Sequence, residues 1–340
     1  MDKTIKKPRE SNIELLRLVC MGLIILFHCT SAIKRSECTG TELVILTAIG
    51  SWGILGVDTF IIITAWFMRH TTEVRFKKVL GMIAMTLFYI LAYYLISYFT
   101  GNKTPAAWAE GLGHDFLFSP FFTTSYWFIW SYLALYAIIP YLNQISLQGP
   151  IRYVLPAFLF LANFHSHGTF IEDFPYFTAI YLTCRIVLST PGNFFERHAA
   201  KGFIGCTLLI IICSCWLGKV PYTGFLQIFL CNTGRHSILM LTDALFFFYL
   251  FRNLKMKHSP AVNFMAGTVF GIYLFHENKT LRLSHLLTRH LHGQLPPTAS
   301  VLLSALILFA GGISAELLRT GVLALIRKVH KKRGLQKPLS

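Results

Sequence analysis

The sequence predicts an all-α, polytopic integral membrane protein with about ten transmembrane helices and with both termini on the cytoplasmic side. Composition is the first reason. The 340 residues are 54% hydrophobic and only 14% charged, whereas soluble chains carry about 25% charged residues. The second reason is that apolar stretches of roughly 20 residues, the length that crosses a bilayer, recur along the chain.

The apolar segments define the expected spans and the domain organisation. We place the spans at about 12–33, 43–68, 79–100, 125–141, 153–165, 174–190, 202–217, 236–252, 261–277 and 298–320. Two long connections, 101–124 and 278–297, contain prolines and are interpreted as loops with local turns. The chain then divides into a basic N-terminus (1–11), a membrane domain (12–326) and a basic tail (327–340).

The distribution of positive charge sets the orientation. With the N-terminus inside, 22 of the 31 Lys and Arg residues fall on the cytoplasmic side and 8 outside, and Arg17 lies within the first span. An excess of Lys and Arg in cytoplasmic loops is the usual determinant of membrane orientation. The net charge of +16 is therefore explained by topology, which argues against a nucleic-acid partner.

Two ionisable residues in the first span are candidates for function. Arg17 and His28 are eleven residues apart, so they share one helix face about 16 Å apart along the axis. Arg17 is expected in the inner leaflet and His28 towards the outer one. The alternative is an interfacial arginine paired with Glu14 and a histidine that only bonds neighbouring helices.

Further polar residues lie in the second and ninth spans. Asp58 lies in the middle of the second span and needs either a buried Arg or His as its partner or a water-filled cavity. The nearby Gly53 and Gly56 are explained by close helix packing. His276, Glu277 and Asn278 end the ninth span near the outer face. There they either form a binding site or are polar residues that contact only water and lipid headgroups.

Four segments, in this order, resemble the acyltransferase-3 family of bacterial membrane enzymes that O-acylate surface glycans. They are SNIELLRLVCMGLIILFHCTS with Arg17 and His28, GVDTFIIITAWFM, residues 125–143, and GIYLFHEN (271–278). The resemblance runs from Ser11 to about Arg327. Thr64 and Ala65 replace the family's Ser-Gly, and Thr72 stands where a second Arg often follows Arg69. No soluble esterase-like domain is expected after the last span.

The resemblance implies transfer of an acyl group, expected to be acetyl, from cytoplasmic acyl-CoA to a hydroxyl of a cell-surface or lipid-linked glycan. His28 is then the catalytic base or a transient acyl carrier, since imidazole suits proton transfer near pH 7. Asp58, His276, Glu277 and Asn278 would support the acceptor side. The donor's phosphates would meet a cationic group on the inner side, which consists of Arg17, Arg69, Arg75, Lys77 and Lys78.

Acyl-CoA is the only expected co-substrate, and no metal is expected. The expected location is a bacterial cell membrane, with membrane lipids and the glycan as partners. The oligomeric state is not readable from the sequence. A transporter or flippase of lipid-linked sugars is the alternative function, although the two halves of the chain show no convincing internal repeat. A membrane sensor is a third reading, but the sequence shows no soluble output domain.

Overall fold

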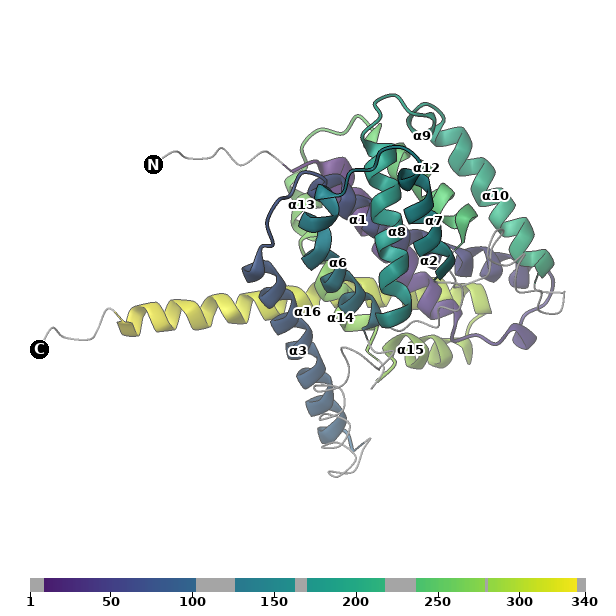
Figure 1. Cartoon of the computed structure of the whole chain (residues 1–340). Helices are drawn as coiled ribbons and strands as arrows, with labels where there is room; N and C mark the ends of the chain where they lie inside the picture. Colours follow the sequence, from purple (N-terminus) through teal and green to yellow (C-terminus); the bar gives the residue numbers. More distant parts are fainter. Residues whose placement is uncertain (1–8, 102–125, 163–169, 218–236, 279–280, 335–340) are drawn as a thin grey trace, which may run out of the picture.

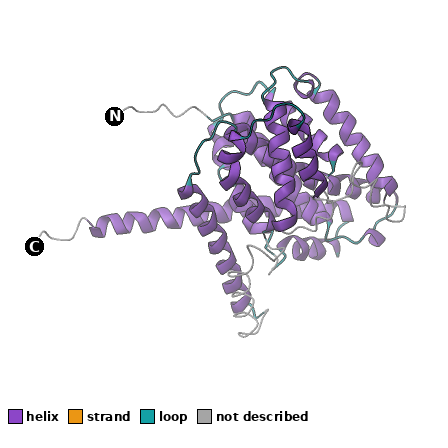
Figure 2. Ribbon diagram, in the orientation of Figure 1, coloured by secondary structure: helices purple, strands orange, loops and turns teal. Residues whose placement is uncertain are grey.

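The computed structural model describes residues 9–101, 126–162, 170–217, 237–278 and 281–334. Within these ranges every regular element is helical and no strand occurs (Figure 2). This confirms the all-α prediction. The predicted connection 101–124 lies almost entirely outside the described residues.

Helices occupy the positions of the predicted spans. Their bounds are α1 Ser11–Thr30, α2 Gly40–Met68, α3 Phe76–Phe99, α6 Trp127–Gln144, α7 Ile151–Ala162, α8 Phe170–Leu188, α10 Ala199–Leu217, α12 Ile238–Arg252, α13 Pro260–Ala266, α14 Val269–His276 and α16 Pro297–Gly334. Short helices are η1 Arg35–Glu37, α9 Phe194–Arg197 and α15 Leu283–His292. By length and apolar composition, α1, α2, α3 and residues 297–329 of α16 can each cross a membrane, and α7 and α10 hold shorter apolar helices. Ten spans stay a prediction.

The first two helices pack closely against one another in the bundle (Figure 1). Glycines on α2 allow this approach. A Cβ at Gly56 would lie 2.7 Å from the carbonyl oxygen of Cys20, and one at Gly53 would collide with the Phe27 ring. These two glycines therefore allow close helix packing, as expected from the sequence. In Figure 1, α3 and the long α16 extend away from the rest of the bundle.

Polar contacts join one set of helix ends, which we call the inner end because the sequence predicts these ends to be cytoplasmic. The amide of Asn12 donates to the carbonyls of Phe251 and Arg252. The amide of Asn143 donates to the carbonyls of Met68 and Thr71. We call the opposite end, where α1 finishes and α16 begins, the outer end. This grouping is what a chain that alternates direction from helix to helix produces.

Two predictions about the last third of the chain need correction. The ninth span is broken: α13 ends before Gly267 and α14 begins after Thr268. At the break, both the N–H and the hydroxyl of Thr268 donate to the carbonyl oxygen of Met265. These bonds replace the regular helical ladder and kink the chain. The predicted loop 278–297 contains a helix, α15, because Leu283 and Leu287 pack onto the core.

A buried ion pair within α16 is joined to α3 by a hydrogen bond from Tyr89. The guanidinium of Arg319 donates to both carboxylate oxygens of Glu316 at 2.7 and 2.6 Å, and the Tyr89 hydroxyl donates to the same carboxylate at 3.2 Å. Gly271 on α14 leaves room for Glu316, since a Cβ there would lie 2.6 Å from its Oε2. Pairing in this way compensates for the cost of burying the charges. The close approach at Gly271 also brings α14, which leads to the candidate site, against α16.

Candidate active site

The centre of the candidate site is a pair formed by α1 and the end of α14. His28 lies in the last turn of α1, and Glu277 directly follows α14. The Nε2 atom of His28 lies 2.8 Å from Oε2 of Glu277, which is the distance of a charge-assisted hydrogen bond. The His28 side chain keeps 22% of its surface exposed, so the pair is accessible. Residues from opposite ends of the chain are thus brought into direct contact by the fold.

His276 completes the group beside this pair. Its ring centroid lies 5.4 Å from that of His28, and the residue is 1% exposed. Its Nδ1 lies 2.8 Å from the Ile272 carbonyl oxygen, so Nδ1 carries the proton and Nε2 keeps a lone pair. Among the described residues, Nε2 of His276 has no hydrogen-bond partner. A buried polar atom without a partner is costly and calls for an explanation, such as a substrate group.

Asn278 holds the turn that carries this group. Its Nδ2 donates to the Tyr126 hydroxyl at 3.1 Å, and its Oδ1 accepts from the Leu281 N–H at 3.3 Å. The Tyr126 hydroxyl in turn donates to the Leu274 carbonyl at 3.0 Å. On the other side, the Tyr93 hydroxyl donates to the Phe275 carbonyl. Tyr126 and Tyr93, which the sequence did not single out, therefore fix the end of α14.

The donor set of the three side chains also has the composition of a metal site. One ligand atom from each of His28, His276 and Glu277 lies within 4.8 Å of the others. Two histidines and a carboxylate are ligands that zinc uses. The 2.8 Å contact between His28 and Glu277, however, is that of a hydrogen-bonded pair. Ligands on a shared tetrahedral zinc, each about 2.0–2.2 Å from the metal, stand farther apart than this.

The helix α15 lies beside the pair at the outer end. His285 Nε2 lies 3.5 Å from the Ser31 hydroxyl, which itself donates to the His28 carbonyl. Arg289 donates to both oxygens of Glu37 at 2.9 and 2.7 Å. This hydrogen bonding from Arg289 holds the pKa of the Glu37 carboxyl below its usual value. Burial, reinforced by neighbouring positive charges, lowers the pKa of His285.

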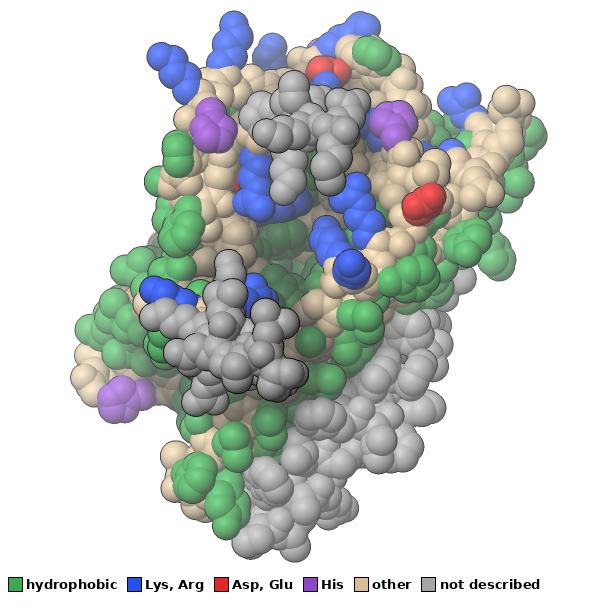
Figure 3. Space-filling view, turned by 90° about the vertical axis from the view of Figure 1, so that its left-hand side faces the viewer, with side chains coloured by type: hydrophobic (Ala, Val, Ile, Leu, Met, Phe, Trp, Pro, Cys, Tyr) green, Lys and Arg blue, Asp and Glu red, His purple; other side chains and the backbone are tan. Residues whose placement is uncertain are grey.

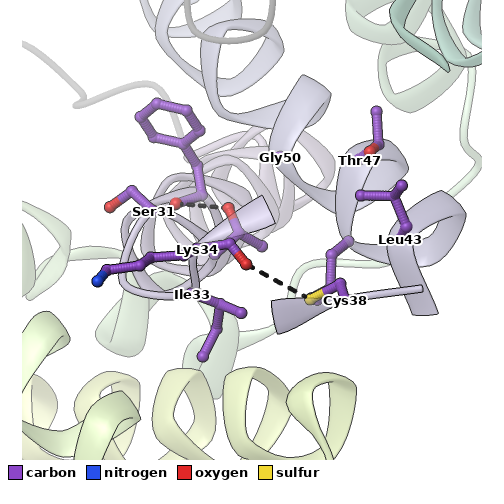
Figure 4. Close-up of a pocket in the computed structure, with 10 residues that line it drawn as sticks. Ser31, Ile33, Lys34, Cys38, Leu43, Thr47 and Gly50 are labelled. Carbon is purple, nitrogen blue, oxygen red and sulfur yellow. Dashed lines mark hydrogen bonds between the residues drawn. The ribbon is translucent and has the colours of Figure 1, made fainter. Parts of the chain in front are cut away.

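A pocket of about 200 Å³ opens next to the outer end of α1. In Figure 4, Ser31 and Ile33, which follow α1, lie on one side of this pocket, and Leu43 and Thr47 of α2 lie on the other. Phe27 also lines it, and the Phe27 ring lies 5.3 Å from that of His28 in an edge contact. His28 itself does not line the pocket, which therefore adjoins the catalytic candidate without containing it.

Asp58 lies elsewhere in the bundle. It is fully buried, and its Oδ2 accepts a 2.9 Å hydrogen bond from the Tyr176 hydroxyl on α8. Its neighbour Gly56 packs on Cys20, about 12 Å inward from His28 along α1. Asp243, a second buried carboxyl that the sequence did not single out, accepts a 3.0 Å bond from the Thr207 hydroxyl. Both acids have helix–helix partners in the core.

Three of the predicted donor cations gather at the inner end. Lys78 is close enough to Arg17 and Arg75 for their charges to act on it. The Arg17 guanidinium lies 3.4 Å from Glu14 and 5.4 Å from the centre of the Phe67 ring. Lys77 is exposed on the same segment. Figure 3 shows Lys and Arg side chains around a hollow that contains hydrophobic side chains.

Arg69 has a different environment. Its guanidinium stacks on the Trp66 ring at 3.8 Å, and Arg252 lies over the same ring at 4.5 Å. The Trp66 N–H donates to Glu10 at 3.3 Å, and Arg252 pairs with Glu196 at 2.9 Å. Arg69 and Arg252 thus share cation–π contacts with Trp66. From the sequence, Arg252 was recognisable only as a positive charge on the inner side.

Comparison with known families identifies the family of the chain. The model of the acyltransferase domain family (Acyl_transf_3) matches residues 10–316, nearly the whole chain. A search of curated proteins and a search of solved structures each found no match. The matched range contains α1, α2, α14 and the His28–Glu277 pair. The chain therefore belongs to the acyltransferase-3 family and is a multi-pass membrane protein.

Proposed function

We propose that this protein transfers an acyl group, acetyl in the simplest case, from cytoplasmic acyl-CoA to a hydroxyl of a cell-surface or lipid-linked glycan. The contact between His28 and Glu277 carries the proposal. Because Nε2 of His28 faces the carboxylate, the proton lies on Nε2 and Nδ1 keeps the lone pair. A base whose orientation and tautomer are fixed by a carboxylate is the arrangement used for acyl transfer on many unrelated folds.

In the proposed reaction, His28 Nδ1 accepts the proton of the acceptor hydroxyl while the hydroxyl oxygen attacks the acyl carbonyl carbon of the donor. An oxygen–carbon bond forms and the carbon–sulfur bond breaks. The proton passes from His28 to the departing thiolate, which leaves as the free thiol. The buried Nε2 of His276 is suited to accept a hydrogen bond that orients the acceptor hydroxyl. Asn278 positions this group through Tyr126 rather than through contact with the glycan.

The inner end supplies the donor site in this proposal. Arg17, Arg75 and Lys78 lie close together, and cations of this kind bind phosphate through charge-assisted contacts. Lys77 lies on the same segment, and Arg69 would contribute from its stack on Trp66. We further propose ten spans in a bacterial cell membrane with both termini cytoplasmic. Single cysteines at Thr71 and Ser259 should then react only with reagents that enter the cell, and one at Gly293 should react with impermeant reagents.

The test is transfer from labelled acetyl-CoA to the native cell's surface glycan by purified protein, measured as alkali-labile acetate. His28→Ala should lower the rate by about 10²–10⁴-fold at unchanged melting temperature. His258→Ala is the control, because that histidine contacts Asn263 at the inner end. A stable His28→Ala protein with the parent rate would refute the role of His28. Rapid quenching that traps label on the parent protein's His28 would identify an acyl carrier in place of a base. Loss of glycan export without loss of acetate would favour a flippase.

A further inference from the structure

A continuous row of aromatic contacts begins at the inner cations. The Lys78 ammonium lies 5.3 Å from the centre of the Tyr136 ring. From Tyr136 the row follows α6 through Tyr132, at 6.4 Å between ring centroids, and Phe128, at 5.8 Å. These three side chains are four residues apart, so they project from one face of α6.

The row then continues onto α14 and ends at the candidate active site. The ring of Phe128 lies 5.6 Å from that of Tyr273, and the ring of Tyr273 lies 6.0 Å from that of His276. His276 in turn lies 5.4 Å from His28. We call Tyr136, Tyr132, Phe128 and Tyr273 the aromatic row. It joins the cations of the inner end to the reacting histidine without a gap.

The aromatic row faces the interior of the bundle and not lipid. Phe128 contacts Phe60 on α2 at 6.4 Å and Phe177 on α8 at 5.5 Å. The Tyr132 hydroxyl lies 3.3 Å from Thr64 Oγ1 on α2. Phe128 and Tyr132 nevertheless stay partly exposed. Tyr136 and Tyr273 are buried, so Phe128 and Tyr132 form the accessible part of the row.

The aromatic row also connects the two apolar clusters of the core. One apolar cluster unites α1 and α2 with α8, α10 and α12, and a second unites α1 with α3, α14 and α16. Phe60 and Phe128 pack against both. The aromatic row therefore passes from the first cluster, which contains Tyr136, to the second, which contains Tyr273.

The chemistry of the row indicates what it binds. Its members present apolar ring faces and a few hydroxyls, and none of them is charged, so they suit an uncharged chain. The Tyr273 hydroxyl is buried and, among the described residues, has no hydrogen-bond partner. It offers a donor to an amide or thioester carbonyl at the outer end of the row. A donor held at the level of Arg17 must also reach about 16 Å along α1 to arrive at His28.

We propose that the aromatic row is the binding wall for the uncharged, amide-containing arm of the thioester donor, and that it guides the acyl group from the inner cations to His28. This inference rests on the proposed function and specifies the path by which the donor's acyl group reaches His28. The arm lies along Tyr136, Tyr132 and Phe128, and the Tyr273 hydroxyl meets a carbonyl near the thioester. The nucleotide half of the donor stays at the inner end.

The test separates the arm from the nucleotide half. Affinities for acetyl-CoA and for adenosine 3′,5′-bisphosphate are measured for Tyr132→Ala and Phe128→Ala. Each variant should bind acetyl-CoA about tenfold more weakly and bind the bisphosphate like the parent, while Tyr132→Phe keeps the parent affinity. Tyr141→Ala is the matched control, because Tyr141 lies on the same helix but is 67% exposed. It should leave both affinities unchanged.

Two results would overturn the inference: parent affinity for acetyl-CoA in both alanine variants, or equal loss of both ligands. Photolabelling of the unaltered protein with a diazirine-bearing acyl-CoA covers the case in which the variants fold poorly. Label should appear in peptides of α6 and α14, and label confined to residues 69–78 would count against the row. If these results overturn the role of the aromatic row but the parent protein still binds acetyl-CoA and transfers acetate, the proposed function stands. Parent protein that binds no acetyl-CoA would end both.

Discussion

Glu277 holds His28 by a 2.8 Å contact to Nε2, although the two residues come from opposite ends of the chain. The contact distinguishes the two imidazole nitrogens of His28. Nε2 is directed at the carboxylate, and in the proposed reaction Nδ1 is the nitrogen that meets the substrate. The sequence places Glu277 beside its neighbour His276, whereas the fold uses Glu277 for His28 and fixes His276 through the Ile272 carbonyl.

The first prediction concerns that carboxylate. Glu277→Gln keeps the size of the side chain but presents an amide that no longer stabilises the imidazolium or enforces the tautomer. We expect kcat for acyl transfer to fall by about 10²–10⁴-fold with little change in donor affinity. Glu42→Gln is the control, because Glu42 accepts hydrogen bonds from Thr298 at the same end of the bundle. Equal rates for Glu277→Gln and the parent would exclude the pair from the reaction.

Tyr126 is predicted to act as a positioning residue. Its hydroxyl bonds both the Leu274 carbonyl and the Asn278 amide, on either side of the His276–Glu277 turn. Tyr126→Phe loses two hydrogen bonds, each worth about 0.5–1.5 kcal/mol. We expect a lower melting temperature and about a tenfold lower kcat at unchanged affinity for acetyl-CoA. Tyr153→Phe, at an exposed position on α7, should change neither quantity. A drop in stability with the parent kcat would make Tyr126 purely structural.

The inner cations should separate into two groups. Lys78 contacts Tyr136 at the start of the aromatic row, and Arg17 is close enough to Lys78 for their charges to interact. Arg17→Ala should weaken acetyl-CoA binding by more than about tenfold, since each charge-assisted contact is worth roughly 1.5–3 kcal/mol. Arg69 is committed to Trp66 and should affect donor binding less than it affects stability. Calorimetric titration of both variants measures the difference. Parent affinity in both Arg17→Ala and Arg69→Ala would remove the donor site from this end.

Much of the architecture is readable from the sequence because bilayer thickness dictates apolar segment length. The starts and ends of α1, α2 and α3 lie within three residues of the predicted bounds. The break between α13 and α14 was not predicted, since hydropathy continues across Gly267 and only the local hydrogen bonds of Thr268 mark it. Helix α15 was not predicted because its apolar face is narrow and its other residues are polar, as is typical of a loop.

The residues of the candidate site could be singled out from the sequence for a physical reason. His28 and the His276–Asn278 turn were candidates because ionisable groups near a membrane core are costly. Their mutual contact was not predicted, because it depends on how α14 packs against α1. Asp58 met the same criterion, yet its partner is Tyr176 on α8. Burial cost identifies polar residues that need partners but does not say which partners they find.

Acid should loosen the outer end of the bundle. Two groups there have lowered folded pKa values: His285, through burial, and Glu37, through Arg289. A group whose folded pKa is depressed stabilises the fold above its unfolded pKa, and this contribution is lost as pH falls towards the folded value. The contribution of His285 to stability should therefore decline as the pH falls below about 6.5, and that of Glu37 as the pH falls below about 4.5. Between pH 7 and pH 5 the parent should lose more thermal stability than His285→Asn. Parallel curves would show that His285 does not contribute.

Metal ions provide the last prediction. The proposed reaction needs His28 Nδ1 as a free base, so treatment with EDTA should leave the rate of acyl transfer unchanged. Excess Zn²⁺ should inhibit, because His28, His276 and Glu277 bring ligand atoms within 4.8 Å and zinc would compete with the His28–Glu277 hydrogen bond. His276→Ala removes one ligand and should make the residual activity less sensitive to zinc, whereas His258→Ala should not. Inhibition should also weaken at lower pH, since protonated imidazole does not bind metal. Activity that disappears with EDTA and returns with zinc would show that the three side chains form a metal centre, and His28 would then be a ligand and not the base.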